Sequence, residues 1–176
     1  MAKGKKWEKF GEQNSAEDIN ELAKQLRSDG KKDDVYELAE ENGIDKDMVE
    51  LFVNEDIDFI CDKMTAATGK LVKEIEHYEK QYVANAKEVM DALQSMMARE
   101  RVKLSVHKYG VDIDIDITGE ELAAAVRQKG KVLNDILKDV FTKAQKIHLE
   151  GNPASALVIP MVIQEYLNPA KGGKKK

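Results

Sequence analysis

Apolar side chains recur at helical spacing near the start of the chain, and their grouping predicts three short helices within residues 15–54. Ser15 stands where an N-cap residue of the first helix is expected, and Gly30 where that helix ends. Asp33 and Asp45 are suited to cap the second and third helices, because a carboxylate accepts hydrogen bonds from free backbone N–H groups. The pattern predicts a crowded N-terminal helical module.

A longer amphipathic helix is predicted to follow. Apolar residues repeat at spacings of three and four, which is typical of a coiled-coil-like seam. The seam consists of Ile60, Met64, Ala67, Leu71, Ile75, Tyr78 and Tyr82. Asn85 can cap a further helix, and the pattern leaves open whether the chain bends or breaks there. The methionine-rich face of that helix suits core filling better than a plastic binding surface.

The period then changes from helical to alternating. Val102, Leu104 and Val106 alternate with polar residues, and a second alternating run covers 111–117, so a two-stranded hairpin turning at Tyr109-Gly110 is predicted. Further helices are expected to begin at the Thr118 capping box, to span 133–147, and to cover Ala156 to Leu167 with an interruption at Pro160. The predicted fold class is mainly α with a small β-hairpin, an α+β arrangement.

Composition agrees with a folded helical protein. The 176 residues are 42% hydrophobic and 35% charged. No run is apolar enough to span a membrane, so we expect a soluble, intracellular protein. We expect a basic flexible lead over 1–14, an acidic short-helix module over 15–54, the long helix with the hairpin and C-terminal helices over 55–168, and a basic tail over 169–176.

Charge is strongly segregated along the chain. Residues 33–62 carry twelve acidic side chains and a single base, Lys46. Two groups are therefore candidate partner-binding residues: Asp45, Asp47 and Glu50 on the third helix, and Asp112, Asp114 and Asp116 on the hairpin. Alternate residues of a strand lie about 6.8 Å apart, so the hairpin aspartates form an acidic ribbon on the scale of backbone phosphates. Such a ribbon is either a mimic of nucleic acid or an ordinary solvated face.

The segment from Val35 to Phe52 resembles a helix-turn-helix, because Ala39, Gly43 and Val49 have the spacing that lets two helices cross closely. The second of these helices carries acids where a DNA-reading helix offers Arg, Lys, Asn or Gln. Conventional DNA recognition by this element is therefore disfavoured, and a structural helical hairpin with an acidic face is preferred.

Patterns that would indicate catalysis or metal binding fail at named positions. An EF-hand starting at Asp112 would need Gly and Glu where Ile117 and Ala123 stand. A phosphate loop ending at Lys70 would need Gly where Met64 stands. Glu74 and His77 have the spacing of one half of a di-iron site, with no second pair. The single cysteine, Cys61, lies in the acidic block, which raises its thiol pKa. We predict no enzyme activity, no cofactor and no metal.

Three stretches nevertheless resemble a known family. They are LRSDGKKDDVYELAEENGIDKDMVELFVNEDIDFI at 26–60, ELAAAVRQKGKVLNDIL at 121–137 and IPMVIQEYL at 159–167, about a third of the chain. Together they resemble the type II anti-CRISPR proteins, the Cas9 inhibitors of bacterial mobile elements and phages. ELAEENGID and AVRQKGK are the most specific phrases, and both consist of helix and turn signals, so no active residues carry over.

The resemblance implies a protein that binds Cas9 or the Cas9–guide RNA complex in the cytoplasm of a bacterial host cell. Cas9 holds nucleic acid in positively charged channels, to which an acidic surface is complementary. Two alternatives stay open. One is a nucleic-acid-binding accessory protein of a phage or plasmid that contacts DNA through its basic tails. The other is a structural protein that forms homo-oligomers through the long helical seam.

Overall fold

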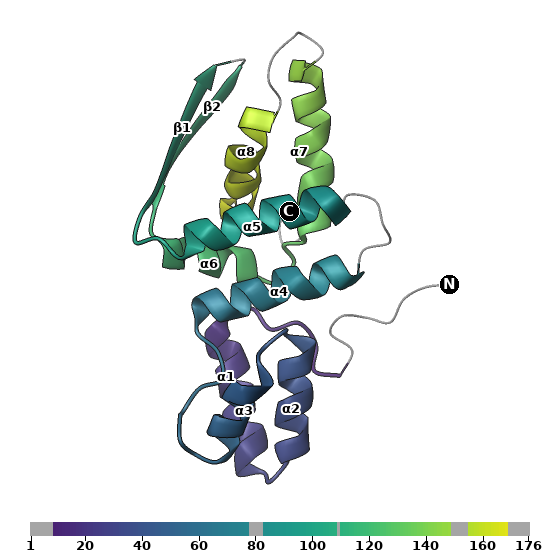
Figure 1. The fold of residues 1–176 in the computed structure, drawn as a ribbon, viewed down its shortest axis with the longest axis vertical. Helices are drawn as coiled ribbons and strands as arrows, with labels where there is room; N and C mark the ends of the chain where they lie inside the picture. Colours follow the sequence, from purple (N-terminus) through teal and green to yellow (C-terminus); the bar gives the residue numbers. More distant parts are fainter. Residues whose placement is uncertain (1–8, 78–82, 109, 149–154, 169–176) are drawn as a thin grey trace, which may run out of the picture.

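A computed structural model describes residues 9–77, 83–108, 110–148 and 155–168. These residues form eight helices and one two-stranded antiparallel hairpin, so the predicted fold class is confirmed. The elements are α1 (Ala16–Ser28), α2 (Lys32–Glu41), α3 (Lys46–Val53), α4 (Lys63–His77), α5 (Val83–Met97), β1 (Val102–Lys108), β2 (Val111–Ile117), α6 (Gly119–Arg127), α7 (Leu133–His148) and α8 (Ser155–Leu167). Figure 1 shows α1–α3 at one end, α4 and α5 across the middle, and α7, α8 and the hairpin at the other end.

The three N-terminal helices begin at the predicted caps in two cases out of three. Ser15 accepts a hydrogen bond from the Asp18 N–H, and Asp45 accepts one from the Asp47 N–H. The prediction that Asp33 caps α2 is wrong, because α2 begins at Lys32 and its N-cap residue has no side-chain hydrogen bond. Here the backbone turn after α1 decides where the next helix starts.

The helices of the predicted helix-turn-helix are close-packed. Ala39 and Val49 are buried, and Gly43 between them has a left-handed φ of 66°. A residue without a Cβ adopts this conformation at no steric cost. The predicted end of the second helix at Asn42-Gly43 is confirmed.

The described helical part of the predicted seam lies on α4 and faces the interior, and Ile60 precedes that helix instead of starting it. Ala67 and Leu71 are buried in the core, with Met64 and Ile75 packed against it, while Tyr78 and Tyr82 lie outside the described residues. Asn85 does not cap α5, which begins two residues earlier. The methionines Met90, Met96 and Met97 pack into the same core, which confirms that they fill it. The described part of the seam is therefore not free to hold a second copy of the chain.

The hairpin pairs Val102 with Ile117 and Lys108 with Val111. Its apolar side chains pack into the core that α8 also lines. At the end of β2, Thr118 and Glu121 form the predicted reciprocal capping box that opens α6. The expected interruption at Pro160 is wrong, because α8 continues through it as one helix. The predicted break at Gly151-Asn152-Pro153 lies outside the described residues.

Two clusters of buried side chains make up the core, and α4 contributes to both. Ala66 belongs to the cluster of α1–α3, and Ala67 and Leu71 belong to the cluster of the C-terminal elements. The N-terminal cluster also takes in Ile60 and Cys61, so this module extends past the boundary expected at residue 54. The helix α4 joins the two halves of the molecule.

Residues 9–14, expected to belong to a flexible lead, are held against the folded chain. Lys9 forms ion pairs with Asp34 at 2.9 Å and with Glu37. Asn14 accepts a hydrogen bond of 3.0 Å from the Lys129 N–H. This segment therefore connects the surface of α2 to the loop that follows α6.

Candidate functional site

The acidic residues predicted on the third helix lie at the exposed N-terminal half of α3. Asp45, Asp47 and Glu50 are all exposed, while Val49 and Phe52 turn inward and are buried. Asp45 uses its carboxylate to cap the helix, and negative charge at a helix N-terminus is favoured by the helix dipole. Among the described residues, none of the three acids forms an ion pair. Their charge is therefore available to a partner.

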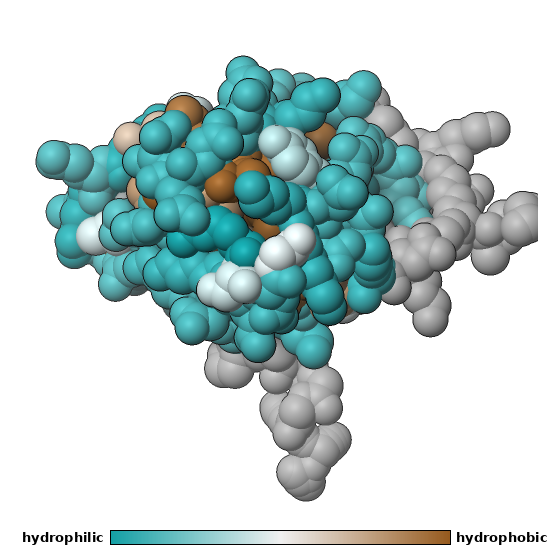
Figure 2. Space-filling model, turned by 90° about the horizontal axis from the view of Figure 1, so that it is seen from below, coloured by the Kyte–Doolittle hydropathy of each residue, from teal (hydrophilic) through white to brown (hydrophobic). Residues whose placement is uncertain are grey.

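The same face continues on both sides of α3. We call the acidic face the exposed acids of α2, α3 and the loop that leads to α4. They are Asp33, Glu37, Glu40, Asp45, Asp47, Glu50, Glu55, Asp56, Asp58 and Asp62. Its only base within 33–62 is Lys46, and Lys9 of the lead reaches Glu37. Figure 2 shows this end of the molecule as a largely hydrophilic surface around a few hydrophobic residues.

The hairpin aspartates share the outward face of β2, as predicted, but cationic and polar groups lie beside them. The strand register places Lys103 opposite Asp116, Ser105 opposite Asp114 and His107 opposite Asp112.

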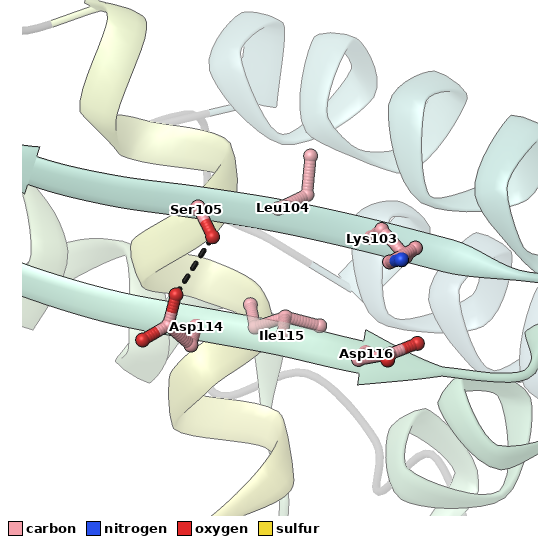
Figure 3. Close-up of a pocket in the computed structure, with 6 residues that line it drawn as sticks. All are labelled: Lys103, Leu104, Ser105, Asp114, Ile115 and Asp116. Carbon is pink, nitrogen blue, oxygen red and sulfur yellow. Dashed lines mark hydrogen bonds between the residues drawn. The ribbon is translucent and has the colours of Figure 1, made fainter.

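Two of these neighbours, Ser105 and His107, bond to the aspartates, and so does Arg101, which precedes β1. Arg101 Nε donates to Asp116 Oδ1 at 2.7 Å. Ser105 Oγ donates to Asp114 Oδ1 at 2.7 Å, as Figure 3 shows. His107 lies 2.5 Å from Asp112 through Nδ1 and 2.9 Å from Asp114 through Nε2. The face is therefore a cross-paired ribbon rather than a bare acidic one.

These pairs move the protonation equilibria of the exposed ribbon. The hydrogen bond to Asp112, followed by the one to Asp114, raises the pKa of His107. The Ser105 hydroxyl and then His107 lower the pKa of Asp114, and Arg101 lowers the pKa of Asp116. The ribbon therefore has less net negative charge than its three aspartates alone would give, which weakens the comparison with successive phosphates.

A shallow hollow of about 410 Å³ lies on the hairpin, lined by Lys103, Leu104, Ser105, Asp114, Ile115 and Asp116. Ser105, His107 and Asp114 are the residue types of a nucleophilic triad, so their geometry matters. Both Ser105 and His107 bond to the same oxygen of Asp114. In a triad the imidazole lies between serine and carboxylate and takes the serine proton. This arrangement does not activate Ser105.

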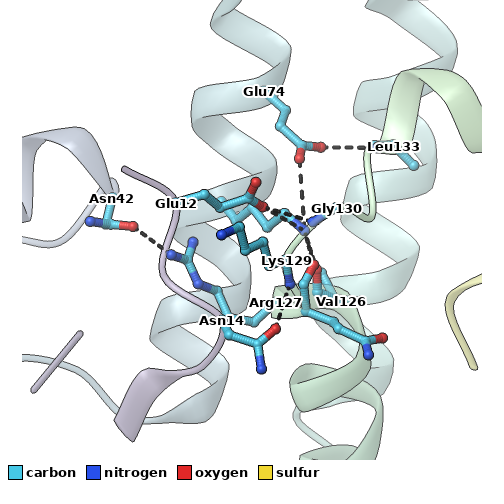
Figure 4. Close-up of polar contacts among 11 residues, drawn as sticks. Glu12, Asn14, Asn42, Glu74, Val126, Arg127, Lys129, Gly130 and Leu133 are labelled. Carbon is cyan, nitrogen blue, oxygen red and sulfur yellow. Dashed lines mark hydrogen bonds and ion pairs between the residues drawn. The ribbon is translucent and has the colours of Figure 1, made fainter. Parts of the chain in front are cut away.

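A buried polar junction, which the sequence analysis did not predict, joins the two halves of the molecule (Figure 4). Lys70 of α4 has a fully buried side chain, and its Nζ donates to the carbonyls of Val126 and Gln128, each at 2.8 Å. Glu12 and Glu74 place carboxylate oxygens 3.8 and 3.9 Å from the same nitrogen. Lys70 therefore satisfies the carbonyls at the C-terminal end of α6, where a cation also complements the helix dipole.

Glu74 performs the complementary task at the next helix. Its Oε1 accepts a hydrogen bond of 3.0 Å from the Leu133 N–H, at the start of α7. Glu74 thus has a structural role at a helix N-terminus, in place of the half metal site suggested by its spacing from His77.

The two most specific phrases of the family resemblance meet at this junction. Arg127 Nη2, from AVRQKGK, donates to Asn42 Oδ1, from ELAEENGID, at 2.7 Å, and both residues are buried. Burial lowers the pKa of the Arg127 guanidinium. In the same phrase, Lys131 Nζ donates to the Glu165 carbonyl at 2.7 Å, near the end of α8. The buried residues of these phrases therefore hold the interior together, while Glu37, Glu40 and Asp45 of ELAEENGID belong to the exposed acidic face.

Cys61 is buried beside Asn20, whose Oδ1 accepts hydrogen bonds from the backbone N–H groups of Ile60 and Cys61. Burial, more than the neighbouring acids, raises the pKa of the thiol to about 12. The predicted direction of the shift is confirmed, and the thiol stays protonated near neutral pH.

The described part of the chain contains no group of three His, Cys, Asp or Glu side chains that could hold a metal ion. None of its helices combines the length and the apolar character that crossing a membrane requires. Comparison of the chain with protein-family models, with curated proteins and with solved structures finds no match.

Proposed function

We propose that this protein is a non-enzymatic inhibitor of CRISPR-Cas9 that binds the nuclease directly through its acidic face. The observation that carries the proposal is the imbalance of charge on that face, where ten exposed acids stand with Lys46 as the only base within 33–62. Like charges at this density repel and lower stability, so a basic partner that neutralises them gives the cluster a function. Cas9 offers such surfaces in the channels that hold its heteroduplex and target DNA.

Of the two predicted contacts, α3 is the stronger candidate. Figure 1 shows α3 and the hairpin in different parts of the molecule, so they do not form one continuous contact surface. Asp45, Asp47 and Glu50 have no ion pair in the described part of the chain, whereas the hairpin aspartates bond to Arg101 and His107. A partner must displace Arg101 and His107 before it can use the hairpin charges.

Two matched triple variants test the proposal. The first is Asp45→Asn, Asp47→Asn and Glu50→Gln, and the control is Asp112→Asn, Asp114→Asn and Asp116→Asn. Asparagine is as good an N-cap residue as aspartate, so the first variant keeps α3 intact. Each protein is mixed with a panel of guide-loaded Cas9 proteins, and target binding and cleavage are measured across salt concentrations.

The parent should inhibit cleavage. The α3 triple should associate more slowly and with a flatter salt dependence, because charges at an interface mainly set the on-rate. The hairpin triple should inhibit almost as well as the parent. Absence of inhibition across the panel, or an α3 triple as active as the parent, would overturn the proposal.

A further inference from the structure

Two large apolar side chains stand exposed within the acidic face. Leu51 of α3 is 43% exposed and Phe59, in the loop between α3 and α4, is 44% exposed. Among the residues that the structure describes, no other large hydrophobic side chain is exposed. Figure 2, which views this end of the molecule, shows hydrophobic residues surrounded by hydrophilic ones. An apolar patch with a polar rim is the usual anatomy of a protein contact.

Hydrogen bonds hold the backbone on both sides of the loop that carries Phe59. After α3 the Asp56 N–H donates to the Leu51 carbonyl at 2.8 Å, and Glu55 takes a left-handed φ of 66°. At the other end of the loop, Asn20 Oδ1 accepts the Ile60 N–H at 2.8 Å, and Ile60 is fully buried. The segment that exposes Phe59 is therefore anchored at both ends, which reduces the conformational entropy lost on binding.

The sequence around the patch is acidic, and one base from α1 reaches the end of α3, where Arg27 Nη1 donates to the Phe52 carbonyl at 2.7 Å. Asp47 lies one helical turn before Leu51 and shares its side of α3, since residues four apart are neighbours on a helix surface. Glu50, Glu55 and Asp58 are close to the two apolar residues in the sequence, and their side chains are exposed. No Lys or Arg occurs from 47 to 62. This charge disfavours nucleic acid, and it disfavours a second copy of the same face, because both would bring negative charge against negative charge.

A lysine of the same chain shows that positive charge complements this surface. Lys9 reaches α2 and forms ion pairs with Asp34 and Glu37, while its backbone N–H donates to Glu41 at 2.7 Å. A basic residue of the chain thus already lies against the neighbouring part of the acidic face. Lys9 does not reach the Leu51 and Phe59 pair in the described contacts.

We infer that Leu51 and Phe59, with Asp47, Glu50 and Asp58 around them, form a docking site for a Lys- and Arg-rich amphipathic segment of a partner protein. Apolar side chains of that segment cover Leu51 and Phe59, and its basic side chains pair with the rim. Such anchors with flanking charges are how grooves and faces recognise amphipathic helices. The inference concerns the chemistry of the partner and holds whether or not the partner is Cas9.

The test uses the full chain and two labelled synthetic peptides. One is an amphipathic helix built from Lys, Arg and Leu, and the other has every Leu replaced by Ser at the same charge. Binding is measured by fluorescence anisotropy at low and moderate salt, and backbone chemical shifts of the parent protein locate the site without any substitution. The variants are Leu51→Ala with Phe59→Ala, and the hairpin triple as control.

The Leu peptide should bind at least about tenfold more tightly than the Ser peptide, and the double alanine variant should lose most of this difference. When the Leu peptide is added to the parent protein, the chemical-shift changes should centre on α3 and residues 54–60. The hairpin triple should bind the peptide like the parent. Circular dichroism melts confirm that each variant is folded at the assay temperature.

Equal binding of both peptides, or shift changes elsewhere, would overturn the inference. So would tighter binding of a DNA duplex at these residues, or a concentration-dependent dimer that the double variant abolishes. Because this assay contains no Cas9, a failure to inhibit Cas9 leaves its result unaffected, and the two proposals fail separately.

Discussion

Replacement of Lys70 by methionine is the sharpest test of how the two halves of the molecule are joined. Methionine keeps most of the side-chain volume but removes the ammonium group. The carbonyls of Val126 and Gln128 each lose a donor at 2.8 Å, and Glu74 loses the cation 3.9 Å from its Oε2. A buried acceptor left without its partner costs about 1–3 kcal/mol. Breaking a buried ion pair costs about 3–5 kcal/mol, so we expect the free energy of unfolding to fall by about that amount.

Lys73 on the same helix provides the matched control. It forms an ion pair of 3.2 Å with Glu76, in which the two side chains are 22% and 61% exposed. Pairs open to solvent contribute about 0–1 kcal/mol, so Lys73→Met should change stability by less than about 1 kcal/mol. The two substitutions are chemically identical and differ only in burial and partners.

Urea unfolding followed by circular dichroism measures both free energies by linear extrapolation. Adding Glu74→Gln to Lys70→Met should recover part of the loss, because Gln is neutral and can still accept the Leu133 N–H. If Lys70→Met costs no more than Lys73→Met, Lys70 is not the buried link described above, and the arrangement of α4 against α6 is wrong.

Three further predictions follow from single positions. A Cβ on Gly69 would lie 2.0 Å from the Asn42 carbonyl oxygen. Gly69→Ala should therefore lower the unfolding free energy by about 1–3 kcal/mol, although Gly to Ala inside a helix normally raises it. A variant as stable as the parent in urea would contradict the close approach of α4 to the end of α2. Glu55→Gly should raise stability by about 1 kcal/mol, since glycine adopts a φ of 66° without strain, and a lower melting temperature would show that this turn is not left-handed. His107 has a raised pKa, so its contribution to stability is present below the usual pKa near 6.5 and is lost as pH rises through the raised value. Asp114 has a lowered pKa, so its contribution is present above about pH 4 and is lost on acidification. His107→Gln should therefore flatten the alkaline limb of the stability–pH curve, and NMR titration should give this imidazole a pKa above that of a free histidine; a titration at or below the ordinary value would disprove the pairing.

Local signals in the sequence predict most of the element boundaries. Ser15, Asp45 and the Thr118–Glu121 box start helices where the caps indicate, because a cap is made between residues two or three apart. The hairpin follows from strict alternation over 111–117, and its pairing then follows from the turn. The exposure of Asp45, Asp47 and Glu50 was equally predictable, since they fall on the polar side of a short amphipathic helix.

The tertiary structure alone decides which charges are available and which hold the fold together. Lys70 looks in sequence like any lysine of a solvated helix, and its burial depends on carbonyls 56 and 58 residues away. Arg127 meets Asn42 across 85 residues, and the outward face of β2 is partly neutralised by Arg101 and His107 of neighbouring segments. Hydrophobic periodicity records which side of an element faces inward, and it does not record which remote element lies there. The sequence therefore determined the helices, the hairpin and the acidic face. The packing of α4 between two cores determined the buried junction, and the cross-strand contacts of the hairpin decided that its acids are paired while those of α3 are not.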